Sequence, residues 1–140
     1  MGTNYYFETK NMIKAKEEIN TILRKHTVHN EVNTEILITD IEDFIDRKCR
    51  IHICKTSAYW NPMIWGNTNY KTLDDIQEFY DKNKEKLIII DEYGTEVSLD
   101  WLIRKMYDFR NKAVYGLEND GYYDHIDRDS GFRVTYDEFS

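Results

Sequence analysis

Apolar residues recur every three or four positions along four segments of the chain, and this spacing predicts four helices. The first is expected over Lys10–Lys25 and the second over Thr34–Arg47. The third is expected over Leu73–Lys84 after the capping residue Thr72, and the fourth begins after Ser98. The positions expected to face inward are Met12, Ala15, Ile19, Ile22, Leu23, Leu37, Ile41, Phe44, Ile45, Leu73, Ile76, Phe79, Tyr80, Leu99, Leu102, Ile103, Met106 and Phe109.

Short alternating or continuous apolar runs predict the strands. These runs lie at Asn4–Phe7, Cys49–Lys55, Leu87–Ile90 and Phe132–Tyr136. Thr56–Asn69 is interpreted as a loop or a hairpin, and Asp91–Gly94 as a tight turn. One alternative stays open, because Glu35–Ile38 suits a strand as well as the start of a helix.

Together these elements predict an α+β fold, in which a short antiparallel sheet packs with three to four helices. A chain of 140 residues suits a single domain, expected over residues 1–140 with a helical insertion at about 10–47. Its 41% apolar and 14% aromatic residues exclude a disordered chain.

The balance of acidic and basic residues limits which classes of binding partner are expected. Acids outnumber bases 26 to 19, and the net charge of −7 disfavours direct binding to nucleic acid. The segment from Glu118 to the end carries seven acids against two bases, whereas Lys10–Lys25 carries five bases against two acids. Neither a signal peptide nor a membrane span is recognised, so reduced cysteines in a cytoplasm are expected.

Several motifs occur together in a recognisable order. They are Met1–Tyr6 (MGTNYY), Ile51–Trp60 (IHICKTSAYW), Asp91–Gly94 (DEYG) and Glu138–Ser140 (EFS). This order resembles a family of small uncharacterised bacteriophage and prophage proteins. The resemblance implies a phage accessory protein in the host cytoplasm, and it implies no activity.

Many members of that family carry a Cys-x-x-Cys pair before the His-Ile motif, which resembles half of a zinc knuckle. This chain has the helix-rich segment there instead. It also carries Cys54 and Tyr59 where the family usually has glycine. The zinc half of the family's pattern is therefore missing.

A metal site is the first chemical hypothesis. On an alternating strand His52 and Cys54 share a face, so they form one plausible zinc set with His26 and His29. No spacing among these four is diagnostic, and buried cysteines with ordinary histidines explain them as well. No cofactor is therefore expected, with zinc as the alternative. A calcium loop starting at Asp127 is disfavoured, because glycine stands at its fifth position rather than at its sixth.

Catalysis has less support. Asp91 and Glu92 follow a buried strand, where catalytic carboxylates often lie, but Asp91–Gly94 also makes an ordinary turn. No glycine-rich phosphate loop and no nucleophile elbow is present in the sequence. Whether the protein is an enzyme stays open, and a binding role is favoured.

Binding through aromatic and acidic surfaces is the main hypothesis. Aromatic side chains are the usual anchors of interfaces, and spaced carboxylates can occupy a basic groove that normally binds nucleic acid. The expected partner is a host protein or ribonucleoprotein, such as a CRISPR effector that a phage protein would inhibit. The candidate residues are Tyr59, Trp60, Trp65, Asp91, Glu92, Tyr93, Asp124, Asp127 and Asp129.

A small-ligand or metal-binding protein is the alternative. Lys55, Trp60, Arg104 and Arg110 would supply cationic and stacking contacts to a phosphorylated ligand such as a nucleotide signal.

Overall fold

The computed structural model describes residues 2–26, 35–43, 50–118 and 125–136. In chain order the elements are β1 (Gly2–Thr9), α1 (Lys10–His26), a helix over residues 35–43, β2 (Ile51–Ser57), β3 (Trp60–Trp65), α3 (Leu73–Asn83), β4 (Leu87–Asp91), β5 (Glu96–Val97), α4 (Leu99–Lys112), β6 (His125–Ile126) and β7 (Arg133–Thr135). None of the helices in these ranges is long and apolar enough to cross a membrane.

The mixed α/β architecture agrees with the predicted class, but the prediction of a short antiparallel sheet is wrong. The sheet has seven strands in the order β5-β4-β1-β2-β3-β7-β6, and β3 pairs with β7 in parallel. β5 and β6 are two-residue strands, too short to leave a pattern in the sequence. α3 and α4 lie between β3 and β7 in the chain. Because these two strands are far apart in the sequence, no local pattern predicts that they pair in parallel.

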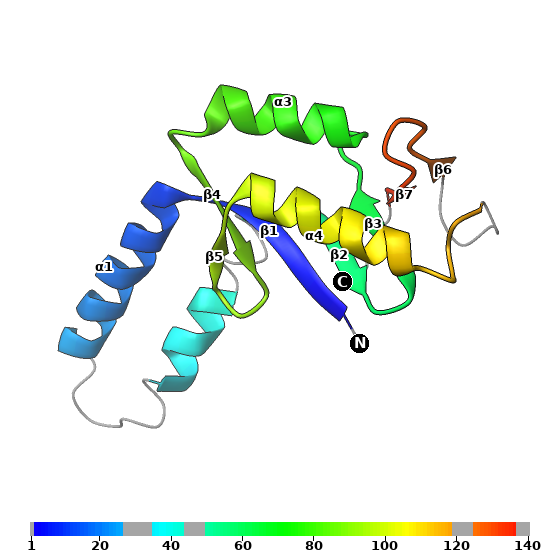
Figure 1. Ribbon diagram of the computed structural model, residues 1–140. Coiled ribbons are helices and arrows are strands. Elements are labelled where there is room, and N and C mark those ends of the chain that lie inside the picture. The colour runs from blue at the N-terminus through cyan, green and yellow to red at the C-terminus, as the bar shows by residue number, and fades with distance from the viewer. Residues whose placement is uncertain (1, 27–34, 44–49, 119–124, 137–140) are drawn as a thin grey trace.

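One face of the sheet packs against α3 and α4, which run across the same side (Figure 1). Tyr5 and Phe7 lie two residues apart on β1 and therefore point to the same face. The Tyr5 ring contacts Trp101 of α4 at 6.2 Å, and the Phe7 ring contacts Phe79 of α3 at 5.5 Å. The buried cluster consists of Tyr5, Phe7, Ile53, Cys54, Ile64, Tyr70, Leu73, Ile76, Leu87, Ile89, Leu99, Leu102, Met106, Phe132 and Val134.

Both predicted helix caps are confirmed. The Thr72 hydroxyl accepts a hydrogen bond from the Asp75 amide at 3.1 Å, and the Ser98 hydroxyl accepts one from the Trp101 amide at 3.1 Å. These bonds satisfy amides that the first turn of a helix leaves without a partner. They fix where α3 and α4 begin relative to the sheet.

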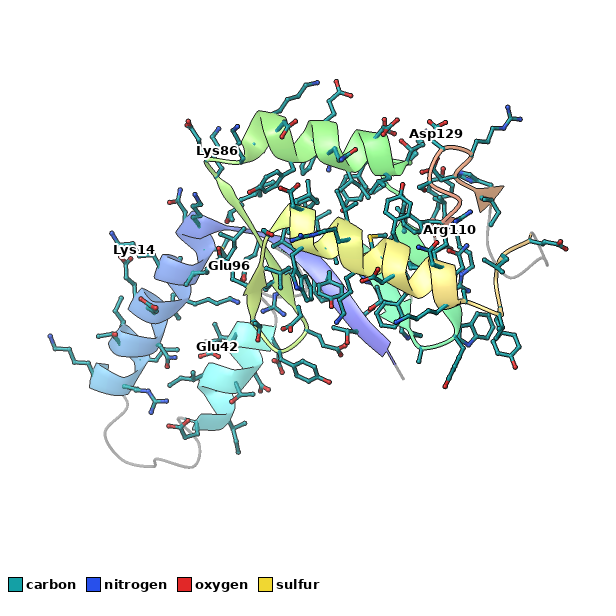
Figure 2. All side chains as sticks on the ribbon, viewed as in Figure 1. Lys14, Glu42, Lys86, Glu96, Arg110 and Asp129 are labelled. Carbon is teal, nitrogen blue, oxygen red and sulfur yellow. The ribbon has the colours of Figure 1, made fainter. Side chains whose placement is uncertain are left out.

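α1 and the helix over residues 35–43 form a pair that extends to one side of the sheet, where Lys14 and Glu42 are labelled (Figure 2). Asn20 donates to Glu42 at 2.7 Å, and Arg24 pairs with Glu35. The helical alternative for residues 35–38 is confirmed over the strand.

The predicted inward faces of this pair are partly wrong. Ile22 and Leu37 are 57% and 44% exposed, whereas Ile38 is buried. The predicted inward positions Phe44 and Ile45 lie outside the described residues. Helical spacing therefore located these helices but did not identify which positions face the protein.

Candidate functional site

The turn between β2 and β3 carries a group of exposed apolar side chains. Tyr59, Trp60, Val114, Tyr115 and Leu117 lie together there, with exposures from 37% for Trp60 to 66% for Tyr59. We call this group the tip patch. Adjoining exposed apolar residues are uncommon on isolated domains and typically mark interaction surfaces.

Backbone hydrogen bonds hold the two segments of the tip patch together. The amides of Val114 and Tyr115 both donate to the Tyr59 carbonyl, at 2.8 and 3.0 Å, and the Asn61 amide donates to the Tyr115 carbonyl at 2.9 Å. The rings of Trp60 and Tyr115 lie 5.0 Å apart. The segment after α4 is thus bound to the edge of the hairpin, which places the two sets of exposed side chains side by side.

Buried polar contacts support the tip patch from below. Asn61 is fully buried, and its side-chain amide donates to the carbonyls of Gly116 and Gly131 at 2.9 and 2.8 Å. Arg133 donates to the Asn61 carbonyl at 2.8 Å and places its guanidinium 5.0 Å from the Trp60 ring centre. Such a cation–π contact orients the indole. The Trp60 ring is therefore held in place before binding and would lose little side-chain freedom when a partner binds.

Tyr59 adopts a strained backbone conformation. Its φ is +69°, and it is the only described residue other than glycine with a positive φ. This region suits glycine or asparagine and costs other residues about 1–3 kcal/mol. Strain of this kind tends to persist at functional sites, so Tyr59 is a candidate for a functional side chain.

Trp65, at the other end of β3, lies away from the tip patch. It is buried, and its ring stacks on His52 at 4.2 Å, while His52 stacks on Tyr6 at 4.8 Å. We call these three residues the inner stack. Because Trp65 follows the core residue Ile64 on the strand, it points to the face opposite α4.

His52 and Cys54 are the two residues of the hypothetical zinc set whose side chains the structure describes, and they do not lie together. The pairing of β1 with β2 shifts between Tyr5 and Tyr6, with Tyr5 opposite Cys54 and Tyr6 opposite His52. This bulge places Cys54 in the core with Tyr5, whereas His52 joins the inner stack. The expectation that His52 and Cys54 share a face is therefore wrong. His29 lies outside the described residues, and His26 ends α1.

The protonation states of these two groups follow from their burial. Burial lowers the pKa of His52 to about 4, a direction that nearby Lys55 reinforces, so the imidazole is neutral at pH 7. Burial raises the pKa of the Cys54 thiol. A protonated, buried thiol is a poor metal ligand and a poor nucleophile. Among the described residues, no group of three or more His, Cys, Asp or Glu is arranged to hold a metal ion.

Asp91 and Glu92 accept backbone hydrogen bonds at the turn that follows β4. The Asp91 carboxylate accepts the amides of Tyr93 and Thr95 at 2.8 and 2.9 Å, and Gly94 has the positive φ expected of it, +85°. Glu92 accepts the Asn4 amide at 3.0 Å. Tyr93 is 81% exposed at the apex of this turn, apart from the tip patch. The two carboxylates thus have structural hydrogen bonds.

Asp127 is buried rather than part of an acidic surface. One of its oxygens accepts the Leu73 amide at 3.1 Å and the Ser130 hydroxyl at 2.6 Å. The carboxylate therefore lies at the N-terminus of α3, where the helix dipole favours a negative charge. Asp129 is exposed at the outer edge of the molecule (Figure 2), and Asp124 lies outside the described residues.

A hollow of about 570 Å³ lies along the outer side of α4. Two sets of residues at four-residue spacing line it, namely Trp101, Lys105 and Phe109 beside Arg104, Asp108 and Lys112. We call it the α4 groove. Of its residues the sequence singled out only Arg104 as a ligand contact. Phe109 was expected to face inward but is only partly buried beside the groove, and the remaining lining residues resembled an ordinary solvated helix face.

Arg110 and Lys55, the other cations of the small-ligand alternative, lie elsewhere. The Arg110 guanidinium packs over Gly131, where an added Cβ would lie 2.4 Å from Nε (Figure 2). Lys55 pairs with Met63 inside the sheet, next to the core residue Cys54, and so points to the face opposite α4.

No protein-family model, curated protein or solved structure matches this chain. The resemblance to phage proteins therefore stays a prediction.

Proposed function

We propose that this protein is a non-enzymatic binding protein whose tip patch engages another protein. The observation that carries the proposal is the exposed Tyr59–Trp60 pair on a strained turn over a rigid base. Tyr and Trp are enriched among the residues that dominate binding energies at protein interfaces. A strained tyrosine that is the most exposed residue of the tip patch is easiest to explain as a contact residue.

The partner is proposed to be a host protein or ribonucleoprotein, acting in a host cytoplasm as the phage resemblance implies. The net charge of −7 supports a partner with a basic surface, because complementary fields speed association and orient the two proteins. A nucleic-acid-guided defence complex, such as a CRISPR effector, presents that kind of surface. Exposed Glu118 follows directly on Leu117 of the tip patch and supplies a carboxylate at its rim.

The test is capture of a partner from host lysate by the tagged chain, compared with two single variants. Tyr59→Ala and Trp60→Ala are each expected to weaken binding of the captured partner about thirtyfold, as loss of an interface anchor does. Tyr93→Ala is the matched control, because Tyr93 is an exposed tyrosine on another turn, 81% exposed against 66% for Tyr59. It is expected to bind like the wild type.

Two results would contradict the proposal. One is the absence of any specific partner at low and moderate salt alike. The other is a partner that both tip variants bind as well as the wild type does. Thermal melting of each variant confirms that the fold is intact, since the two side chains are exposed and contribute little to the core.

A further inference from the structure

We infer that the α4 groove is a binding site for a nucleotide, a small molecule with a phosphate and an aromatic base. This site is separate from the tip patch. Three of the residues that line the groove are cations, namely Arg104, Lys105 and Lys112. In the described part of the chain, no carboxylate forms an ion pair with any of these three. Their charges are therefore available to an anion.

The aromatic residues of the groove flank the central cation. The Lys105 ammonium lies 4.9 Å from the Trp101 ring centre and 5.8 Å from that of Phe109. Trp101 is itself held by an edge contact with Tyr5 of β1. An aromatic base can stack on such rings while its phosphate meets the neighbouring cations. Cations alone would indicate only an anion, whereas the rings indicate a ligand that also carries a planar group.

The groove continues into a second hollow of about 350 Å³, because Trp101, Lys105 and Phe109 line both. The second hollow lies at the ends of β1, β2 and β4, and its lining is partly polar and partly apolar. Two hydroxyl groups and a carboxylate that suit a sugar line it, contributed by Thr3, Ser57 and Asp91. The two hollows together have the size of a small-molecule site, with cations at one end and hydroxyls at the other.

The overall charge decides between a mononucleotide and a nucleic-acid strand. A strand would carry many phosphates past a protein of net charge −7, whereas the groove supplies only three cations beside Asp108. A single phosphate group needs no larger basic surface. The groove therefore fits a free nucleotide better than a polymer.

The test is titration of the intact chain with adenosine monophosphate, followed by the fluorescence of Trp101. Saturable quenching is expected, and Trp101→Phe should remove the signal. Lys105→Ala should weaken binding about tenfold, because a charge-assisted hydrogen bond to phosphate is lost. Asp108→Asn should tighten binding about threefold, because a repelling charge is removed. Lys82→Ala is the matched control, since this exposed lysine of α3 pairs with Glu78 away from the groove.

Three results would overturn the inference. The first is no saturation at millimolar nucleotide. The second is equal affinity for inorganic phosphate, which would show that the rings are not used. The third is much tighter binding of a single-stranded oligonucleotide that Lys105→Ala also weakens, which would make the groove a strand site. Because Tyr59→Ala should leave nucleotide binding unchanged, failure of this inference and failure of the tip-patch proposal are distinguishable.

Discussion

Trp60 and Trp65 begin and end the same strand, yet they have opposite roles in the molecule. Trp60 is held by an arginine and a tyrosine at the surface, whereas Trp65 is buried against a neutral histidine. In the sequence both belong to one aromatic segment and both were candidates for partner binding. The comparison shows that an aromatic residue is an interface candidate only when its surroundings leave it exposed.

The largest expected difference between the two ends of β3 is in stability. Trp65→Ala should lower the free energy of unfolding by about 3–5 kcal/mol, because it leaves a cavity beside His52. Trp60→Ala should cost less, about 1–2 kcal/mol, because 37% of that residue is already exposed. Urea denaturation of both variants checks this. Similar losses for the two would show that Trp60 is a core residue and would remove it from the tip patch.

The inner stack should also make stability depend on pH. The pKa of His52 is about 4 in the folded protein and about 6.5 in the unfolded chain, so folding disfavours protonation of this imidazole. The contribution of neutral His52 to the free energy of unfolding is therefore fully present above pH 6.5, and it is lost as the pH falls toward 4. Between pH 7 and pH 5 the loss should reach about 2 kcal/mol.

His52→Phe is the matched variant for this prediction, because it keeps a ring between Tyr6 and Trp65 but cannot titrate. Denaturation at several pH values should show a flatter profile for the variant over that interval. An unchanged slope would mean that other groups cause the pH dependence.

The smallest expected change in the free energy of unfolding is at the tip patch, where a substitution should stabilise the protein rather than destabilise it. Tyr59→Asn should raise the free energy of unfolding by about 0.5–1 kcal/mol, because asparagine tolerates a φ of +69° better than tyrosine does. The same change should weaken partner capture. Thermal melting measures the first effect, and a lower melting temperature would show that the Tyr59 side chain stabilises the fold instead.

Sequence periodicity predicted much of the fold, because helices depend on neighbours a few residues apart. α1 was expected over Lys10–Lys25 and runs over Lys10–His26, and α3 and α4 begin at the predicted caps. Tyr59 and Trp60 were predicted as candidate contact residues from their type alone. Their neighbours Val114, Tyr115 and Leu117 were missed, since no local signal places the end of α4 beside a hairpin 55 residues earlier.

By itself the sequence determined the local elements of this protein, its acidic charge and the type of side chain available for binding. Those properties depend on backbone propensity, capping and composition, which act over short distances. Only the tertiary structure decided that Asp127 is a buried cap, that a bulge separates His52 from Cys54, and that the α4 groove continues into a hollow at the ends of three strands. Each of these features depends on contacts between residues far apart in the chain. Packing, rather than local backbone preference, determines which of those residues become neighbours.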